Sequence, residues 1–160
     1  MIPMVKDQKE ALEIVKYTKY PPLGRRGAGF GFAHNEYKNE NPIDLMEYAN
    51  KTLINIIQIE NKSGLENVEE IAKTDDVDCL WVGHFDLSNF LGVPGQFDSK
   101  IYLNAIDKIV KAGMKYQKSL GIMVSSRQEM DFYSDFGFNA IAVGTEMNLL
   151  MDKISNLMKK

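Results

Sequence analysis

The sequence predicts an α/β protein with a parallel sheet, built from about five strand-helix units. Short apolar, β-branched segments alternate along the chain with amphipathic segments of helical period. Such alternation favours a parallel sheet, because each helix forms the right-handed crossover between two neighbouring strands. The chain has 160 residues, and eight units of this repeat length correspond to a barrel of roughly 250 residues. We therefore expect part of a (β/α)8 TIM barrel, and an open doubly wound sheet is the structural alternative.

The apolar segments and the helical patterns give the expected order of elements. Strands are expected at residues 2–5, 53–60, 79–83, 120–124 and 140–143. Helices are expected at residues 7–17, 42–53, 63–72 and 100–119, from residue 126 onward, and at 146–158. No composition break divides the chain, so residues 1–160 are expected to form a single domain.

Local signals support several of these boundaries. Three pairs have the spacing of a capping box at a helix start, namely Asp7 with Glu10, Ser63 with Glu66, and Ser126 with Glu129. Residues 20–32 contain two prolines and four glycines, which predicts a loop. The last helix has an apolar stripe that is typical of core packing. Its members are Met147, Leu150, Met151, Ile154, Leu157 and Met158.

Composition excludes several classes of partner. The formal net charge is -3 with scattered lysines, so there is no basic patch for nucleic acid or for an anionic membrane. No apolar run approaches the length of a membrane span, and the N-terminus does not have the pattern of a signal peptide. The single cysteine, Cys79, lies in an apolar run and excludes an internal disulfide. We expect a cytoplasmic protein.

Two carboxylates stand just past the ends of two expected strands. Glu60 ends the second strand, and Asp86 follows the third within Gly83-His84-Phe85-Asp86. The carboxyl ends of parallel strands meet on one face, so these oxygen donors are expected to share a divalent cation. Gln58 lies two residues before Glu60 and therefore on the same face of the strand. The structural alternative is that Glu60 caps the next helix or pairs with Lys62, and that Asp86 caps a turn.

Four separated motifs make the chain resemble the HpcH/HpaI family of metal-dependent pyruvate aldolases. They are Tyr20-Pro21-Pro22-Leu23-Gly24-Arg25-Arg26-Gly27, Gln58-Ile59-Glu60, Gly83-His84-Phe85-Asp86-Leu87-Ser88 and Ala142-Val143-Gly144. The resemblance implies a barrel of the phosphoenolpyruvate/pyruvate type that lacks its first three strand-helix units. It also implies that Glu60 and Asp86 are the metal ligands and that Gln58, with the backbone N–H groups of Phe85 and Asp86, binds pyruvate.

The reaction implied by the resemblance is cleavage of a 4-hydroxy-2-oxo acid into pyruvate and an aldehyde. Oxygen-only ligands favour Mg²⁺, Mn²⁺ or Co²⁺ as the cofactor. The family's general-base histidine and a substrate-binding arginine come from a segment outside this sequence, so no catalytic base is assigned. His84 and Arg26 are candidates to contact the metal ligands or the substrate, rather than the metal itself. In related enzymes the helix that corresponds to the last one here packs on a neighbouring subunit, so the resemblance implies a homo-oligomer.

Two other functions remain open from the sequence. One is a CoA-ester lyase of the citrate-lyase β type, which similar barrels support. The other is a noncatalytic oligomerising or binding protein, in which the two carboxylates only cap local structure.

Overall fold

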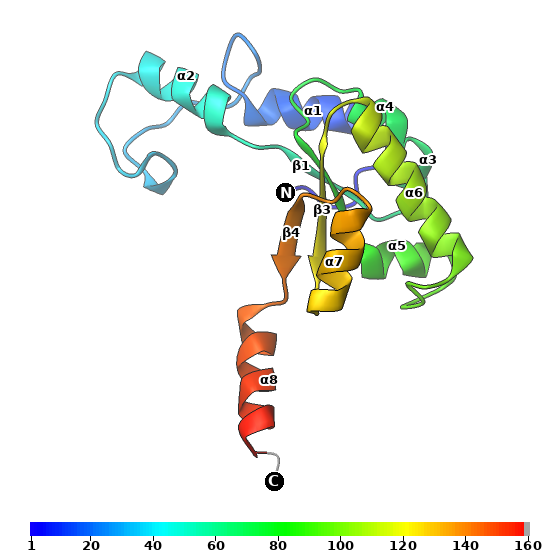
Figure 1. Cartoon of the computed structure of the whole chain (residues 1–160). Helices are drawn as coiled ribbons and strands as arrows, with labels where there is room; N and C mark the ends of the chain where they lie inside the picture. Colours follow the sequence, from blue (N-terminus) through cyan, green and yellow to red (C-terminus); the bar gives the residue numbers. More distant parts are fainter. Residues whose placement is uncertain (159–160) are drawn as a thin grey trace.

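A four-stranded parallel sheet forms the centre of the computed structural model, which describes residues 1–158 (Figure 1). The strands are β1 (Ile56–Ile59), β2 (Cys79–Val82), β3 (Ser119–Val124) and β4 (Ala140–Val143). They lie side by side in the order β1-β2-β3-β4, with every neighbouring pair parallel. The expected α/β class and parallel sheet are therefore confirmed.

Helices precede the first strand, connect the strands and follow the last one. They are α1 (Gln8–Thr18), the 3-10 helix η1 (Ala33–Asn35), α2 (Pro42–Thr52), α3 (Lys62–Glu66), α4 (Val68–Ala72), α5 (His84–Phe90), α6 (Lys100–Lys115), α7 (Arg127–Asp135) and α8 (Glu146–Met158). None of the helices described over residues 1–158 is long and apolar enough to cross a membrane.

The sheet buries one face against helices and leaves the other more open. On the covered face, Ile57, Leu80 and Ile122 are fully buried and belong to one apolar cluster with residues of α1, α4 and α6. On the other face, Trp81 is half-buried and Met123 is exposed. A doubly wound sheet has helices on both faces and a reversal of strand order. Sequential order with helices on one face is instead the wall of a barrel, so the barrel expectation is confirmed and the doubly wound alternative is wrong.

The first expected strand, residues 2–5, forms only a single parallel bridge between Ile2 and Ile57. Ile2 accepts a hydrogen bond from the Gln58 backbone and donates one to the Ile56 carbonyl, both at 2.9 Å. Pro3 has no N–H to continue a ladder, and Met4 adopts a left-handed φ of 59°. Residues 1–158 thus contain four strands plus one bridge, rather than the five expected strands.

Local capping signals were partly correct. Asp7 and Ser126 accept hydrogen bonds from the backbone N–H groups of Glu10 and Glu129, as the capping spacing predicts. The Ser63 prediction is wrong, because Asn61 caps α3 by accepting from the Gly64 N–H at 2.8 Å. Ser63 lies inside that helix.

The terminal helix α8 does not pack in the core. It extends away from the sheet in Figure 1, and none of its described residues is buried. Leu150 and Met151 are each 55% exposed. The core-packing prediction for its apolar stripe is wrong because no other helix of residues 1–158 covers it.

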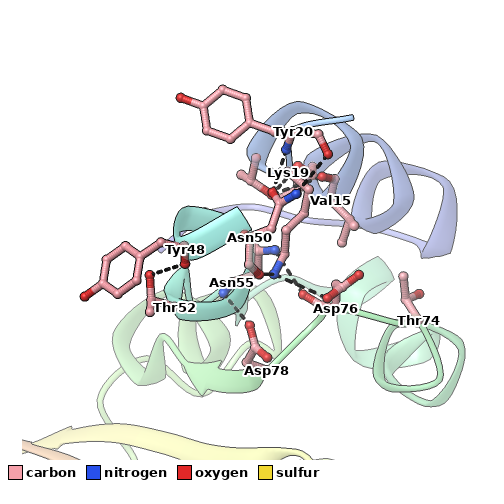
Figure 2. A network of polar contacts seen from close by, with 12 residues as sticks. Val15, Lys19, Tyr20, Tyr48, Asn50, Thr52, Asn55, Thr74, Asp76 and Asp78 are labelled. Atoms are coloured by element: carbon pink, nitrogen blue, oxygen red, sulfur yellow. Dashed lines mark hydrogen bonds and ion pairs between the residues drawn. The ribbon is translucent and has the colours of Figure 1, made fainter. Parts of the chain in front are cut away.

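A polar network ties the helices to the starting ends of β1 and β2 (Figure 2). The Lys19 side chain is almost fully buried, and its Nζ donates to the Asn50 carbonyl at 2.7 Å and lies 3.3 Å from Asp76 Oδ1. Asn55, just before β1, donates its backbone N–H to Asp78 Oδ2 at 2.7 Å. The network therefore fixes α1 and α2 at the end of the sheet opposite to the two candidate ligands.

Candidate metal centre

Glu60 is a buried carboxylate at the carboxyl end of β1. Only 4% of the residue is exposed, and Oε1 accepts a hydrogen bond from the Met4 backbone N–H at 2.7 Å. Its other oxygen rests on β2, because a Cβ added to Gly83 would lie 2.2 Å from Glu60 Oε2. Glycine at position 83 is therefore what leaves room for this carboxylate. A buried carboxylate with a single hydrogen bond gains from a cation, which offsets its lost hydration.

Asp86 lies in the first turn of α5, just after the end of β2. The pairing of Ile59 with Val82 brings the carboxyl ends of β1 and β2 to the same level. Both carboxylates thus leave the same edge of two neighbouring strands, and the Asp86 side chain is exposed there. The Met4 N–H holds Glu60 while Asp86 is open to solvent, so a cation bound by both carboxylates would keep positions for water and substrate.

The chemistry of the donor set fits a hard divalent cation. Two carboxylates offer oxygen ligands of the type that Mg²⁺ and Mn²⁺ prefer. Within residues 1–158, no group of three or more His, Cys, Asp or Glu side chains could hold a metal ion. A cation here would therefore complete its coordination with water or with an oxygen-rich substrate rather than with a closed protein cage.

The backbone N–H groups at the start of α5 can bind an anion. Gly83 is the N-cap residue and has no side chain to accept a hydrogen bond from the first N–H groups of α5. Phe85 and Asp86 are both exposed in this turn. On the neighbouring strand, Gln58 pairs in register with Trp81 and lies on the same strand face as Glu60. These positions are compatible with the sequence prediction that they bind a carboxylate substrate.

His84 packs among aromatic rings. Its imidazole stacks on Phe97 with 4.7 Å between ring centroids and meets the edge of Phe85 at 4.9 Å. Burial lowers the pKa of His84, and the Glu129 carboxylate opposes this effect. Its Nδ1 is buried and has no hydrogen-bond partner among the described residues. His84, two residues before Asp86 in the chain, is thus held as a tightly packed ring.

Arg26 lies in a different place. Its guanidinium sits 4.8 Å above the Tyr20 ring, and its backbone N–H donates to the Lys19 carbonyl. Arg26 lines a cavity of about 630 Å³ between the glycine-containing loop and α2, and the lining includes neither Glu60 nor Asp86. The structure therefore brings together Gln58, Glu60 and the start of α5, and places Arg26 in a separate cavity.

Two residues of the site were not found by sequence reasoning. Gly83 lies within a motif that the sequence singled out, but its contact with Glu60 depends on strand register. Met4 holds Glu60 through a backbone N–H, and a methionine side chain gives no signal for that contact. A glycine at the end of an expected strand is the one signal that could have identified Gly83, since such a glycine often marks a close approach of another group to the backbone.

Comparison with known proteins finds one matching family. The family model described as HpcH/HpaI aldolase/citrate lyase matches residues 1–152. A hydroxypyruvate/pyruvate aldolase of Delftia acidovorans is 34% identical over 150 residues, which cover 94% of this chain and 55% of that protein. A 4-hydroxy-2-oxo-heptane-1,7-dioate aldolase of Escherichia coli is 31% identical and covers 94% of this chain, which spans 57% of that protein.

Solved structures show the same fold. An HpcH/HpaI aldolase/citrate lyase family protein from Burkholderia cenocepacia superposes with a TM-score of 0.92 at 26% identity, covering 99% of this chain and 62% of that one. An HpcH/HpaI aldolase from Desulfitobacterium hafniense has a TM-score of 0.88 at 25% identity and covers 98% of this chain and 60% of that one. The chain is thus a partial (β/α)8 barrel that spans less than two thirds of these relatives, and it belongs to the HpcH/HpaI aldolase/citrate lyase family.

Proposed function

We propose that Glu60 and Asp86 hold one divalent cation, Mg²⁺, Mn²⁺ or Co²⁺, and that residues 1–160 act as one domain in the aldol cleavage of 4-hydroxy-2-oxo acids to pyruvate and an aldehyde. The observation on which this proposal rests most is the buried Glu60 carboxylate, seated on Gly83 at the carboxyl end of β1. The aldolase names of the relatives support the reaction class.

The residues of this chain would bind and orient the substrate. The bound cation would supply Lewis-acid stabilisation of the negative charge that develops on the 2-oxo oxygen as the carbon-carbon bond breaks. The N–H groups of Phe85 and Asp86 would hold the substrate carboxylate, and the Gln58 amide would donate to a substrate oxygen. The buried Glu60 is already fixed by Met4, so it needs little rearrangement to act as a ligand.

The complete aldol cleavage is expected to need further residues besides those of this chain. The chain spans 55% and 59% of the two hydroxypyruvate/pyruvate aldolases that it resembles. By family resemblance, the base that takes the proton from the 4-hydroxyl group belongs to a segment outside residues 1–160. Metal and pyruvate binding are therefore the properties that we expect of this chain by itself.

We also propose a homo-oligomer in the cytoplasm. The exposed apolar stripe of α8 supports contact with a second subunit, because water-exposed Leu150, Ile154 and Leu157 gain free energy when they are covered. Cys79 is a free buried thiol, as expected in a reducing compartment.

Calorimetric titration with Mn²⁺, with and without pyruvate, tests the metal site. The unchanged chain should bind Mn²⁺ more tightly when pyruvate is present. Glu60→Gln and Asp86→Asn should each weaken Mn²⁺ binding at least tenfold, whereas Asp107→Asn on the surface of α6 should not. Equal Mn²⁺ affinity in all four proteins would overturn the ligand assignment.

A second candidate reaction is the lysis of a CoA ester of the citrate-lyase β type. The family description includes citrate lyase, which keeps this candidate open. Product analysis after incubation with a hydroxy-oxo acid or with an acyl-CoA separates the two reactions. If neither substrate is cleaved and no metal binds, the protein is instead a noncatalytic oligomerising or binding protein.

A further inference from the structure

The only tryptophan of the protein, Trp81, lies on the open face of the sheet, two residues before Gly83 at the end of β2. Trp81 pairs in register with Gln58 on β1 and with Gly121 on β3. Residues two apart on a strand share a face, so Trp81 and Gly83 point to the same side, where Glu60 rests on Gly83. The indole therefore belongs to the layer of side chains next to the one that contains the carboxylate.

The sequence leaves space for this large ring. A Cβ added to Gly121 would lie 2.3 Å from Trp81 Cε3 and 3.1 Å from Cys79 Sγ. The indole thus lies against the backbone of β3 at Gly121, across the inner surface of the sheet. The next strand continues the layer with Ala140, another small residue, which pairs with Gly121. Glycine at 121 serves Trp81 in the same way that glycine at 83 serves Glu60.

The two layers have different chemistry. The upper layer contains Glu60, Gly83 and Met123. Met123 lies two residues after Gly121 on β3, next to Ile122, which pairs with Val82. The lower layer contains the indole and the Gln58 amide. Two residues along a strand separate the layers by about 7 Å. An ion bound by carboxylates at the upper layer would therefore have an apolar ring, rather than water, beneath it.

We propose that the Trp81 indole is the floor of the metal site, a positioning residue that limits the size of the 2-oxo acid bound there. This inference rests on the proposed function. The oxygens of the acid would face the cation, and its carbon chain would meet the indole. Because the ring is backed by Gly121 and Cys79, it cannot retreat to admit a longer chain.

Terbium provides a direct test, because Tb³⁺ takes oxygen ligands and emits when a nearby excited indole transfers energy to it. Tb³⁺ alone is titrated into the chain under excitation that only tryptophan absorbs, and calorimetry follows its binding in parallel. We expect strong, saturable emission that Glu60→Gln abolishes. The matched control is the double variant Trp81→Phe with Phe132→Trp, which moves the donor to α7 in the helix layer and should reduce emission at least fivefold at equal Tb³⁺ occupancy.

A second measurement concerns substrate size. Pyruvate and 2-oxobutanoate are titrated calorimetrically into the Mn²⁺-loaded chain. Trp81→Ala should shift the ratio of their affinities by about tenfold toward 2-oxobutanoate, since an apolar pocket discriminates one methylene by roughly that factor or more. Trp81→Phe, which keeps a ring, should restore most of the original ratio.

The outcomes separate this inference from the proposed function. Tb³⁺ could bind in a Glu60-dependent way with emission no stronger than in the Phe132→Trp control. That result would refute the proposed position of Trp81 beside the ion and leave the metal-ligand assignment intact. An affinity ratio that Trp81→Ala leaves unchanged refutes the size limit in the same way. If no Tb³⁺ binds at all, the metal site itself is overturned, and the floor with it.

Discussion

Substitution of Gly83 by alanine should displace Glu60 from the candidate site. The added Cβ would lie 2.2 Å from Glu60 Oε2 and 2.7 Å from Glu60 Cβ, whereas carbon atoms in contact are about 3.5–4 Å apart. Rotation of the carboxylate cannot relieve the second overlap, because Cβ is attached directly to the backbone. The side chain must leave its seat or the two strands must separate.

The cost follows from the contacts that are lost. The hydrogen bond from the Met4 N–H to the carboxylate contributes about 1.5–3 kcal/mol, and overpacking costs about 1–3 kcal/mol. We expect Gly83→Ala to lower the free energy of unfolding by about 3 kcal/mol and to weaken Mn²⁺ binding about 100-fold, as when a group that orients a ligand is lost.

Urea unfolding and electron paramagnetic resonance titration of Mn²⁺ measure these two effects. Gly27→Ala is the control, because a Cβ at Gly27 meets no atom within 4 Å, and it should change stability by less than about 0.5 kcal/mol. A folded Gly83→Ala protein that binds Mn²⁺ as tightly as the unchanged chain would show that Glu60 does not need its seat on β2, and the reasoning would fail.

Three further predictions concern stability and assembly. Lys19→Met should cost about 2 kcal/mol in urea unfolding, because it leaves the Asn50 carbonyl without its charged donor, and Lys111→Met on the surface should cost less than about 0.5 kcal/mol; equal effects would contradict this. Burial raises the pKa of Cys79 from 9.0 to about 11, so the unfolded thiol loses its proton first and about 2–3 kcal/mol of stability should disappear between these pH values. Cys79→Ala should lack that part of the alkaline loss in pH-dependent unfolding, and an identical pH profile would refute the assignment. Ile154→Asp in α8 should lower the mass measured by light scattering if the stripe joins subunits, and an unchanged mass would exclude this contact.

Local signals in the sequence predicted most of the fold. The β-branched runs identified β1 to β4, and Asp7 and Ser126 were recognisable as caps because a cap depends on residues only three positions apart. Ser63 failed by the same rule, since Asn61 competes for the same start of α3. Residues 2–5 are apolar like a strand, but Pro3 and the left-handed Met4 end their pairing with β1 after one bridge.

Tertiary relations were harder to predict. The placement of Glu60 and Asp86 at neighbouring strand ends followed from parallel topology, which the alternation of elements indicates. The seat of Glu60 on Gly83 depends on the register of β1 against β2, which no local pattern specifies. The stripe of α8 shows which side is apolar but not what covers it, so its exposure could not be predicted.

A crystal structure of the chain with Mn²⁺ and pyruvate would test the shared cation most directly. Anomalous scattering at the manganese edge locates the ion without reference to the protein atoms. We predict one strong peak within coordination distance of both Glu60 and Asp86, with pyruvate oxygens completing its ligands. A peak that touches only one of these carboxylates, or none at this edge of the sheet, would contradict the account.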